Sequence, residues 1–148
     1  MKRLSLILIV FLRLTALKVS AQTVLQIDSV CHSIDHSNFI ERIFGEDTYP
    51  FIDSNKTVHR IRHQSDRADL FCMITFYYKD KKVIKAEITC ENRGSDMVTS
   101  TVYSATYYFD KNICIKAIDE DKKYSNSVEI LNEGITIQDK YYKTNKKN

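Results

Sequence analysis

The sequence contains little glycine or proline, the residues that most often interrupt regular structure. It has three glycines, one proline and no tryptophan in 148 residues. It contains neither a Gly-rich loop that cradles phosphates nor the G-x-S-x-G turn that exposes a catalytic serine. It has no C-x-x-C pair of the kind found in structural zinc sites. These absences argue against common nucleotide-binding and hydrolytic classes, and we expect neither catalysis nor a cofactor.

Long hydrophobic runs are also missing, and the longest one lies at the N-terminus. Residues 4–12 are almost entirely apolar, follow a basic start and precede the small-residue site Val19-Ser20-Ala21. A transmembrane helix needs roughly 20 apolar residues, and Arg13 and Lys18 interrupt this segment. The pattern is that of a signal peptide over residues 1–21, with an uncleaved peripheral anchor as the alternative. We therefore expect a periplasmic or secreted protein with no membrane span in the mature chain.

Charge is nearly balanced once this segment is removed. The full chain has 22 Lys and Arg against 19 Asp and Glu, a formal net charge of +3. Four basic residues and no acidic residue lie in 1–21, which leaves 18 against 19, or −1, for residues 22–148. A basic tail from about residue 140 (Lys140, Lys143, Lys146, Lys147) is interpreted as a solvated end. We expect one domain over 22–148 that does not bind nucleic acid.

The first part of this domain is expected to be helical. Four apolar side chains recur at three- and four-residue spacing, as on one face of a helix: Val24, Ile27, Cys31 and Ile34. Asn38 and Glu41 resemble a capping box, so either one helix continues to about Phe44 or a second one follows, ended by Gly45. Residues 46–55 are polar and predict a loop, and Thr57–His63 predicts an edge strand.

The middle of the chain predicts two β-hairpins, in keeping with its nine tyrosines and seven phenylalanines. Apolar residues alternate in the first hairpin on both sides of a turn at 80–82, and the second hairpin repeats this around 110–112. The alternating residues are Leu70, Cys72, Ile74, Phe76, Tyr78, Ile84, Ala86, Ile88 and Cys90, then Tyr103, Ala105, Tyr107, Phe109, Ile113, Ile115 and Ala117. We interpret the two units as a β-meander with an internal duplication.

The end of the chain fits two structures. Asn126 and Glu129 resemble a capping box of a helix that Val128, Leu131, Ile135 and Tyr142 would line, but residues 134–137 also fit a strand; we favour the helix. The expected architecture is α+β, with the N-terminal helix packed on an antiparallel meander of four or five strands. Because one sheet face shows an apolar row, we expect the other to be solvated or used for binding.

Two features resemble a known group of proteins. The segment Ser20-Ala21-Gln22 is similar to the signal ends of exported proteins of Bacteroidota. The hairpins Tyr77–Lys81 and Tyr107–Lys111, each with a Tyr-Tyr-x-Asp-Lys pattern, resemble those of small uncharacterised exported proteins of that group. The resemblance implies a periplasmic or secreted location and assigns no activity.

The cysteines give the most definite prediction. If Tyr78 pairs with Ile84 around the first turn, Cys72 lies directly opposite Cys90, close to the range that a disulfide needs. Buried free thiols are the alternative. Cys31, on the buried helix face, and Cys114, on the other sheet face, are poor partners.

Several polar and aromatic groups are weaker site candidates. Arg60, Arg62, His63 and Arg67 could clamp an anion, although a charged edge strand gives the same pattern; His59 and His63 would share a face about 13 Å apart. His32 and His36 have a spacing that can chelate a metal, although both lie on the solvent face. Four tyrosines form either an aromatic surface or part of the core: Tyr77, Tyr103, Tyr107 and Tyr108.

These observations favour a small binding or inhibitory module over an enzyme. Such a module would hold a protein or peptide of the cell envelope through a sheet face or an edge strand. The alternative is a metal- or anion-responsive periplasmic protein that uses His32 and His36, or Arg60, Arg62 and His63.

Overall fold

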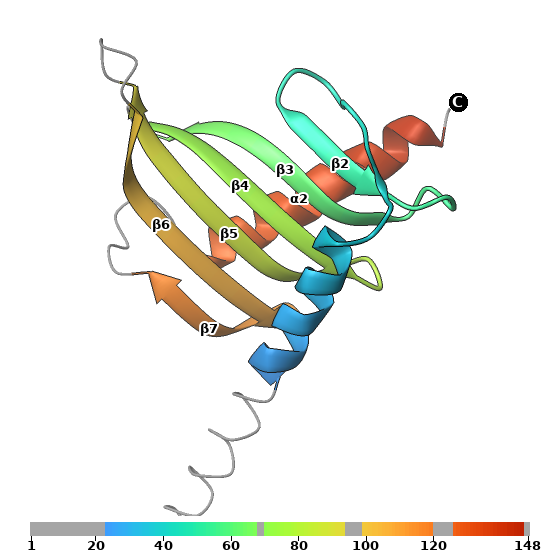
Figure 1. The fold of residues 1–148 in the computed structure, drawn as a ribbon, viewed down its shortest axis with the longest axis horizontal. Coiled ribbons are helices and arrows are strands. Elements are labelled where there is room, and N and C mark those ends of the chain that lie inside the picture. Colours follow the sequence, from blue (N-terminus) through green and yellow to red (C-terminus); the bar gives the residue numbers. More distant parts are fainter. Residues whose placement is uncertain (1–22, 68–69, 94–98, 120–125, 147–148) are drawn as a thin grey trace, which may run out of the picture.

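The computed structural model describes residues 23–67, 70–93, 99–119 and 126–146, so the expected signal peptide lies outside the described residues. The described chain has a helix over residues 23–35, an antiparallel sheet and a C-terminal helix, α2 (Ser127–Asn145). The helix of residues 23–35 lies in front of the sheet and α2 lies behind it (Figure 1). The α+β class is therefore confirmed. None of the described helices has the length and apolar character needed to cross a membrane.

The sheet of the described residues has seven strands rather than the four or five expected. They are β1 (Ile40–Glu41), β2 (Thr48–Ile52), β3 (Val58–Arg67), β4 (Leu70–Lys79), β5 (Lys82–Arg93), β6 (Thr99–Asp110) and β7 (Ile113–Asp119). Each strand pairs with the next one in the chain, which makes the sheet a continuous meander. The prediction of an edge strand near Thr57–His63 was wrong, because β3 pairs with β2 on one side and β4 on the other.

Residues 38–55 were assigned incorrectly from the sequence. They form β1 and β2 instead of a second helix and a loop. Pro50 favoured the prediction of a loop, yet it lies within β2. Its carbonyl accepts a hydrogen bond from the amide of Arg42, on the side of β2 that faces away from β3. A residue's N–H and C=O point the same way in a strand, so the missing N–H costs the β2–β3 ladder nothing.

Both hairpins turn through two residues that have positive φ, as tight hairpin turns require. These are Asp80 and Lys81 in the first hairpin, and Lys111 and Asn112 in the second. A register shift lies beside each turn: Ile84 is the extra residue opposite Tyr77 and Tyr78, and Ile115 is the extra residue opposite Tyr108 and Phe109. The two hairpins therefore share one turn and bulge geometry, in which Tyr77 corresponds to Tyr108 and not to Tyr107 as the sequence pattern had aligned them. The internal duplication stays a prediction.

These bulges reverse the faces of some side chains near the turns. Tyr78 pairs with Val83 rather than with Ile84, so Ile84 packs on the opposite face from the main apolar row. Cys114 pairs with Phe109 and packs against the main core, whereas the alternation had placed it on the other face. Cys72 nevertheless pairs with Cys90, since the register beyond the bulge is the one expected.

The main core lies between the sheet and α2, not between the sheet and the N-terminal helix as expected. It contains the apolar row of β4, the inner residues of β5 and β6, and Ile130, Leu131 and Tyr141 of α2. The C-terminal helix was correctly favoured over a strand: Asn126 is its N-cap and accepts hydrogen bonds from the amides of Val128 and Glu129. Val128 was wrongly assigned to its buried face, since this side chain is 66% exposed.

The N-terminal helix packs on the other sheet face and forms a second, smaller core. Val24, Ile27, Cys31 and Ile34 are buried there as the periodicity predicted, together with Phe51, Tyr77 and Tyr108 of the sheet. The sheet face expected to be solvated is thus partly covered, at the end where the two hairpins turn (Figure 1).

Candidate functional site

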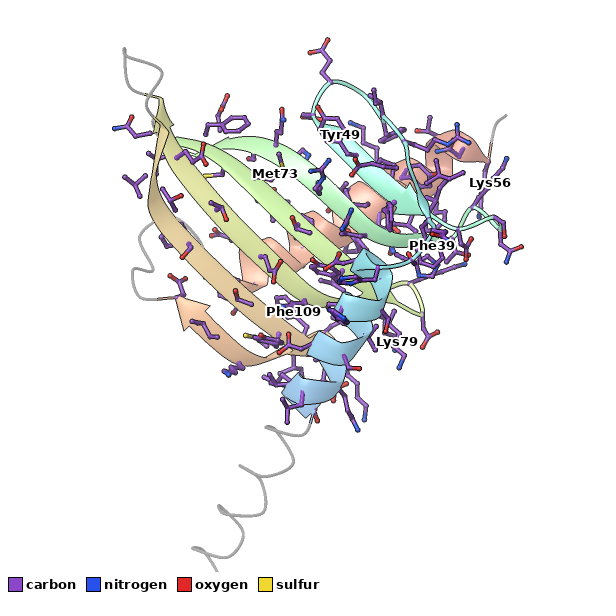
Figure 2. The ribbon with its side chains drawn as sticks, in the orientation of Figure 1. Phe39, Tyr49, Lys56, Met73, Lys79 and Phe109 are labelled. Atoms are coloured by element: carbon purple, nitrogen blue, oxygen red, sulfur yellow. A yellow bond between two sulfur atoms is a disulfide. The ribbon has the colours of Figure 1, made fainter. Side chains whose placement is uncertain are left out.

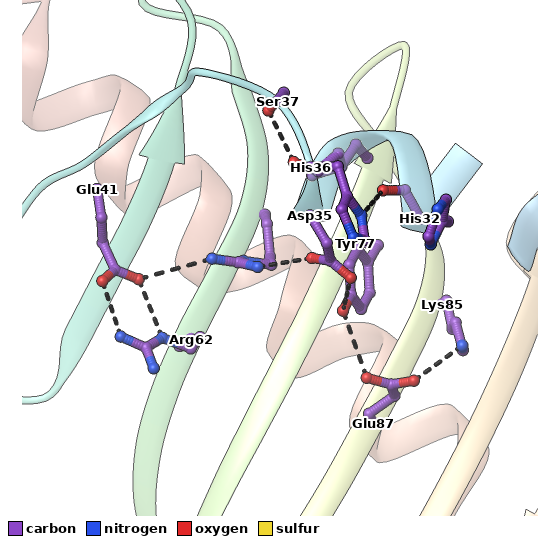
Figure 3. A network of polar contacts seen from close by, with 11 residues as sticks. His32, Asp35, His36, Ser37, Glu41, Arg62, Tyr77, Lys85 and Glu87 are labelled. Carbon is purple, nitrogen blue, oxygen red and sulfur yellow. Dashed lines mark hydrogen bonds and ion pairs between the residues drawn. The ribbon is translucent and has the colours of Figure 1, made fainter. Parts of the chain in front are cut away.

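A line of charged and hydroxyl groups joins the N-terminal helix to the sheet beneath it (Figure 3). Asp35, at the end of the helix, lies 2.6 Å from Nη1 of Arg60 on β3. The hydroxyl of Tyr77 on β4 lies 3.1 Å from the other Asp35 oxygen and 3.4 Å from Glu87 on β5. Burial, together with the charges of Glu87 and Asp35, raises the pKa of Tyr77. The phenol therefore stays neutral and donates to carboxylates.

Lys85 continues this line on β5. Its Nζ lies 2.9 Å from Asp28 of the helix and 2.8 Å from Glu87. Burial alone would lower the pKa of Lys85, but the hydrogen bonds that its ammonium donates to Glu87 and Asp28 outweigh burial and raise it. The ammonium also lies over the ring of Tyr108. Lys85 is therefore a fixed cation that fastens the helix to the sheet.

Replacing Lys85 with methionine is expected to loosen the N-terminal helix. The carboxylates of Asp28 and Glu87 would lose their shared cation, and we expect the free energy of unfolding to fall by about 1–2 kcal/mol. Urea unfolding measures this change, and amide hydrogen exchange should become faster over residues 23–35. Lys82→Met is the matched control, because Lys82 is an exposed residue of the same strand. Equal effects of the two substitutions would contradict this role of Lys85.

The predicted anion clamp is not a single site. Arg60 is paired with Asp35, and Arg62 binds Glu41 through two hydrogen bonds of 3.0 and 2.8 Å. Both guanidinium groups are therefore already bound to carboxylates of the chain. Arg67 is the last residue of β3 and pairs with Leu70, about 23 Å along the strand from Arg60 at roughly 3.3 Å per residue.

His59 and His63 lie on opposite faces of the sheet, so the prediction that they share one was wrong. The register of β3 shifts at His59, since Phe51 pairs with Arg60 and Ile52 with Val58. His59 stacks on Phe39 with ring centroids 4.4 Å apart and hydrogen-bonds Asp53 at 3.0 Å. This bond, with those from two backbone amides, lowers the pKa of Asp53. His63 instead lies 3.9 Å from Glu133 of α2, behind the sheet.

The metal candidates His32 and His36 lie together on the exposed side of the N-terminal helix. Their ring centroids are 4.0 Å apart, and Nδ1 of His36 lies 2.9 Å from the carbonyl of His32. No group of three His, Cys, Asp or Glu side chains that could hold a metal ion occurs among the described residues. The pair therefore has no third protein ligand in the part of the chain that the structure describes.

The four cysteines follow the predicted pairing. Cys72 and Cys90 form a disulfide with an S–S distance of 2.01 Å, and both are fully buried. Cys31 and Cys114 are free. Burial raises the pKa of Cys31 to about 12, so this thiol stays protonated beneath the helix. The structure thus gives Cys31 a packing role.

The tyrosines belong to the core. Tyr77, Tyr103, Tyr107 and Tyr108 are each at most 6% exposed. Tyr103 and Tyr107 pack on the side of α2, while Tyr77 and Tyr108 pack under the N-terminal helix. An aromatic binding surface made of these four residues is therefore excluded.

The two edges of the sheet differ in a way that sequence analysis missed. The outer edge of β2 is covered by the chain itself: β1 pairs with it, and Arg42 and Phe44 donate hydrogen bonds to Pro50 and Thr48. The outer edge of β7 has no neighbouring strand within the described residues. The sequence showed the alternation of β7 but not its place in the sheet, which depends on the order of all seven strands.

The β7 edge is apolar and lies beside a hollow. Ile113 is 67% and Ile118 49% exposed. A hollow of about 370 Å³ is lined by Ile118 and by residues 101–106 of β6. Lys116 is the only charged side chain between these two isoleucines. Within the described residues, this edge combines backbone groups that have no strand partner with apolar contact surface, and the hollow lies between Ile118 and β6.

Comparison of the chain with protein-family models, with curated proteins and with solved structures finds no match.

Proposed function

We propose that this protein is an exported, non-catalytic binding module that recognises an extended segment of a partner protein along the outer edge of β7. The observation that carries the proposal is the contrast between the two edges of the sheet. The chain covers the outer edge of β2 with its own residues 40–44, yet the outer edge of the seven-residue strand β7 has no strand beside it in the described part. An exposed edge strand offers a row of donors and acceptors to an incoming strand.

The composition of β7 supports recognition rather than protection of this edge. Proteins commonly guard edge strands with lysine, proline or a bulge. β7 has one lysine and no proline, and it exposes Ile113 and Ile118. Its bulge recurs at the equivalent place in the β4–β5 hairpin, which lies inside the sheet. The bulge is therefore part of the repeated turn and not a device specific to the edge.

Export remains a proposal that rests on residues 1–21. The Cys72–Cys90 disulfide supports it, because disulfides form and persist mainly in oxidising compartments. A partner in the cell envelope or the surrounding medium fits this location. The alternative of an anion sensor is less favoured, since the carboxylates of Asp35 and Glu41 already bind Arg60 and Arg62.

Proline substitutions in β7 test the edge directly. Successive N–H groups of a strand point to opposite sides, so one of Ala117→Pro and Ile118→Pro removes a donor from the outer edge and leaves the β6–β7 ladder complete. We expect this variant to unfold like the native protein and to lose its partner. The partner is first captured by a photo-crosslinking residue at position 118, with the more exposed position 128 of α2 as control.

Two results would contradict the proposal. One is a partner that crosslinks equally well from position 128. The other is a folded proline variant that binds the captured partner as tightly as the native protein does. Hydrogen exchange adds a separate readout, because an added strand should slow exchange of the outward amides of β7 and leave those of β2 unchanged.

A further inference from the structure

One end of the molecule carries cations around two exposed isoleucines. We call it the basic end; it consists of Ile40, Arg42, Ile43, Lys56, Lys143 and Lys146. Segment 40–44, the loop after β2 and the last turn of α2 meet there around a groove of about 490 Å³, which is lined in part by Ile40, Arg42, Ile43 and Lys56. Lys143 lies in the last turn of α2 and Lys146 caps it. Figure 2 shows Lys56 beside the C-terminal end of α2, and β7 lies on the opposite side of the molecule in Figure 1.

The isoleucines are held outward by ordered backbone. Ile43 is 80% exposed, the highest value among the large apolar side chains described, and Ile40 is 54% exposed. The amides on either side of Ile43 are fixed, since Arg42 donates to Pro50 and Phe44 to Thr48 at 2.8 Å. The ring of Phe44 packs edge-on against Tyr141 of α2. The segment is therefore tied to the sheet and to α2 and cannot turn its isoleucines inward without breaking these contacts.

The cations of the basic end have no carboxylate partners among the described residues. Arg42, Lys56, Lys143 and Lys146 make no ion pair there, in contrast to Arg60, Arg62 and Lys85. Asp53 lies in the groove, but its carboxylate accepts hydrogen bonds from His59 and from the amides of Asn55 and Thr57. The positive charge at this end is thus left for an external anion.

We propose that the basic end docks on the surface of an anionic phospholipid bilayer. Ile40 and Ile43 would enter the boundary between headgroups and acyl chains, and the four cations would lie at the lipid phosphates. Arg42 and Lys56 line the groove beside the isoleucines, and Lys143 and Lys146 lie at the end of α2, so the cations come from three separate elements. This arrangement fits a surface of many phosphates better than one bound carboxylate or one acidic peptide. Docking in this way leaves β7 facing away from the membrane, although the inference does not depend on the function proposed for β7.

Vesicle co-sedimentation tests this inference with the protein purified after export. We expect binding to vesicles that contain phosphatidylglycerol and not to vesicles of phosphatidylcholine alone, and we expect added salt to weaken it. Arg42→Glu and Lys56→Glu should each lower the partition constant about fivefold or more. Ile43→Ser should lower it by a similar factor. All variants share one N-terminus, so residues 1–22 cannot account for differences between them.

Matched controls lie elsewhere on the surface. Val128→Ser removes an apolar group that is 66% exposed, and Lys111→Glu reverses a charge at the β6–β7 turn; both should bind vesicles like the native protein. Absence of binding to phosphatidylglycerol, equal binding to both lipids, or equal losses in the controls would overturn the inference. Binding of a soluble peptide of alternating Glu and Leu at the basic end, without vesicle binding, would also overturn it in favour of a protein partner.

Discussion

Loss of the Cys72–Cys90 disulfide is expected to lower the free energy of unfolding by about 3 kcal/mol. The bridge links residues 18 apart in sequence, and a loop of this length loses roughly that much stabilisation when it is opened. For a domain of this size, the thermal midpoint should fall by roughly 10 °C. The double variant Cys72→Ala/Cys90→Ala tests the loss, with urea unfolding followed by circular dichroism.

Two controls separate the crosslink from the packing of its sulfur atoms. Reduction of the native protein opens the bridge but keeps both sulfurs in the core, so it should produce most of the effect. Cys31→Ala removes a buried thiol that is not crosslinked, and it should cost only the lost packing of one small side chain. If the reduced protein unfolds at the same urea concentration as the oxidised one, the disulfide does not stabilise this fold.

The disulfide also shows which part of the fold the sequence could predict. β4 and β5 pair without a bulge from Cys72 to Phe76, so one correct pair in this stretch fixes all the others, including Cys72 with Cys90. The capping residue Asn126 could also be predicted from the sequence, because a cap is a local contact between a side chain and nearby amides. Such features depend on neighbours in sequence or on an uninterrupted period, and both can be seen without the structure.

Bulges and strand order could not be predicted in the same way. One extra residue at His59 or Ile84 reverses the face of the side chains around it, and nothing in the local composition marks that residue. The anion cluster failed for a different reason: Asp35 and Glu41 lie far away in sequence, yet the fold brings them to Arg60 and Arg62 and pairs them there. The apolar row of β4 was read correctly, but either helix could have covered it. α2 covers this row because it can approach the sheet closely, and hydrophobic periodicity does not show such a close contact.

That contact is made by Gly134, and Gly134→Ala is expected to destabilise the protein by about 1–3 kcal/mol. A Cβ at this position would lie 2.7 Å from Cδ1 of Phe76 and 3.1 Å from Cγ2 of Val83. Phe76 is fully buried, so its ring can shift only by displacing other core residues. Glycine also lets the carbonyl of residue 134 come close enough to accept the hydroxyl of Tyr78 at 2.9 Å. The helix and the sheet would have to separate to admit the methyl group.

Inside an ordinary helix, alanine is favoured over glycine by about 1 kcal/mol. A loss of stability on Gly134→Ala would therefore be opposite in sign to the effect expected from helix propensity alone. Asn132→Ala, on the exposed side of α2, is the matched control and should be neutral or slightly stabilising. Phe76→Leu should make room for the methyl group, so the double variant should lose less stability than the two single losses combined. A stabilising Gly134→Ala would mean that α2 does not approach β4 this closely, and the position of the main core between them would then be wrong.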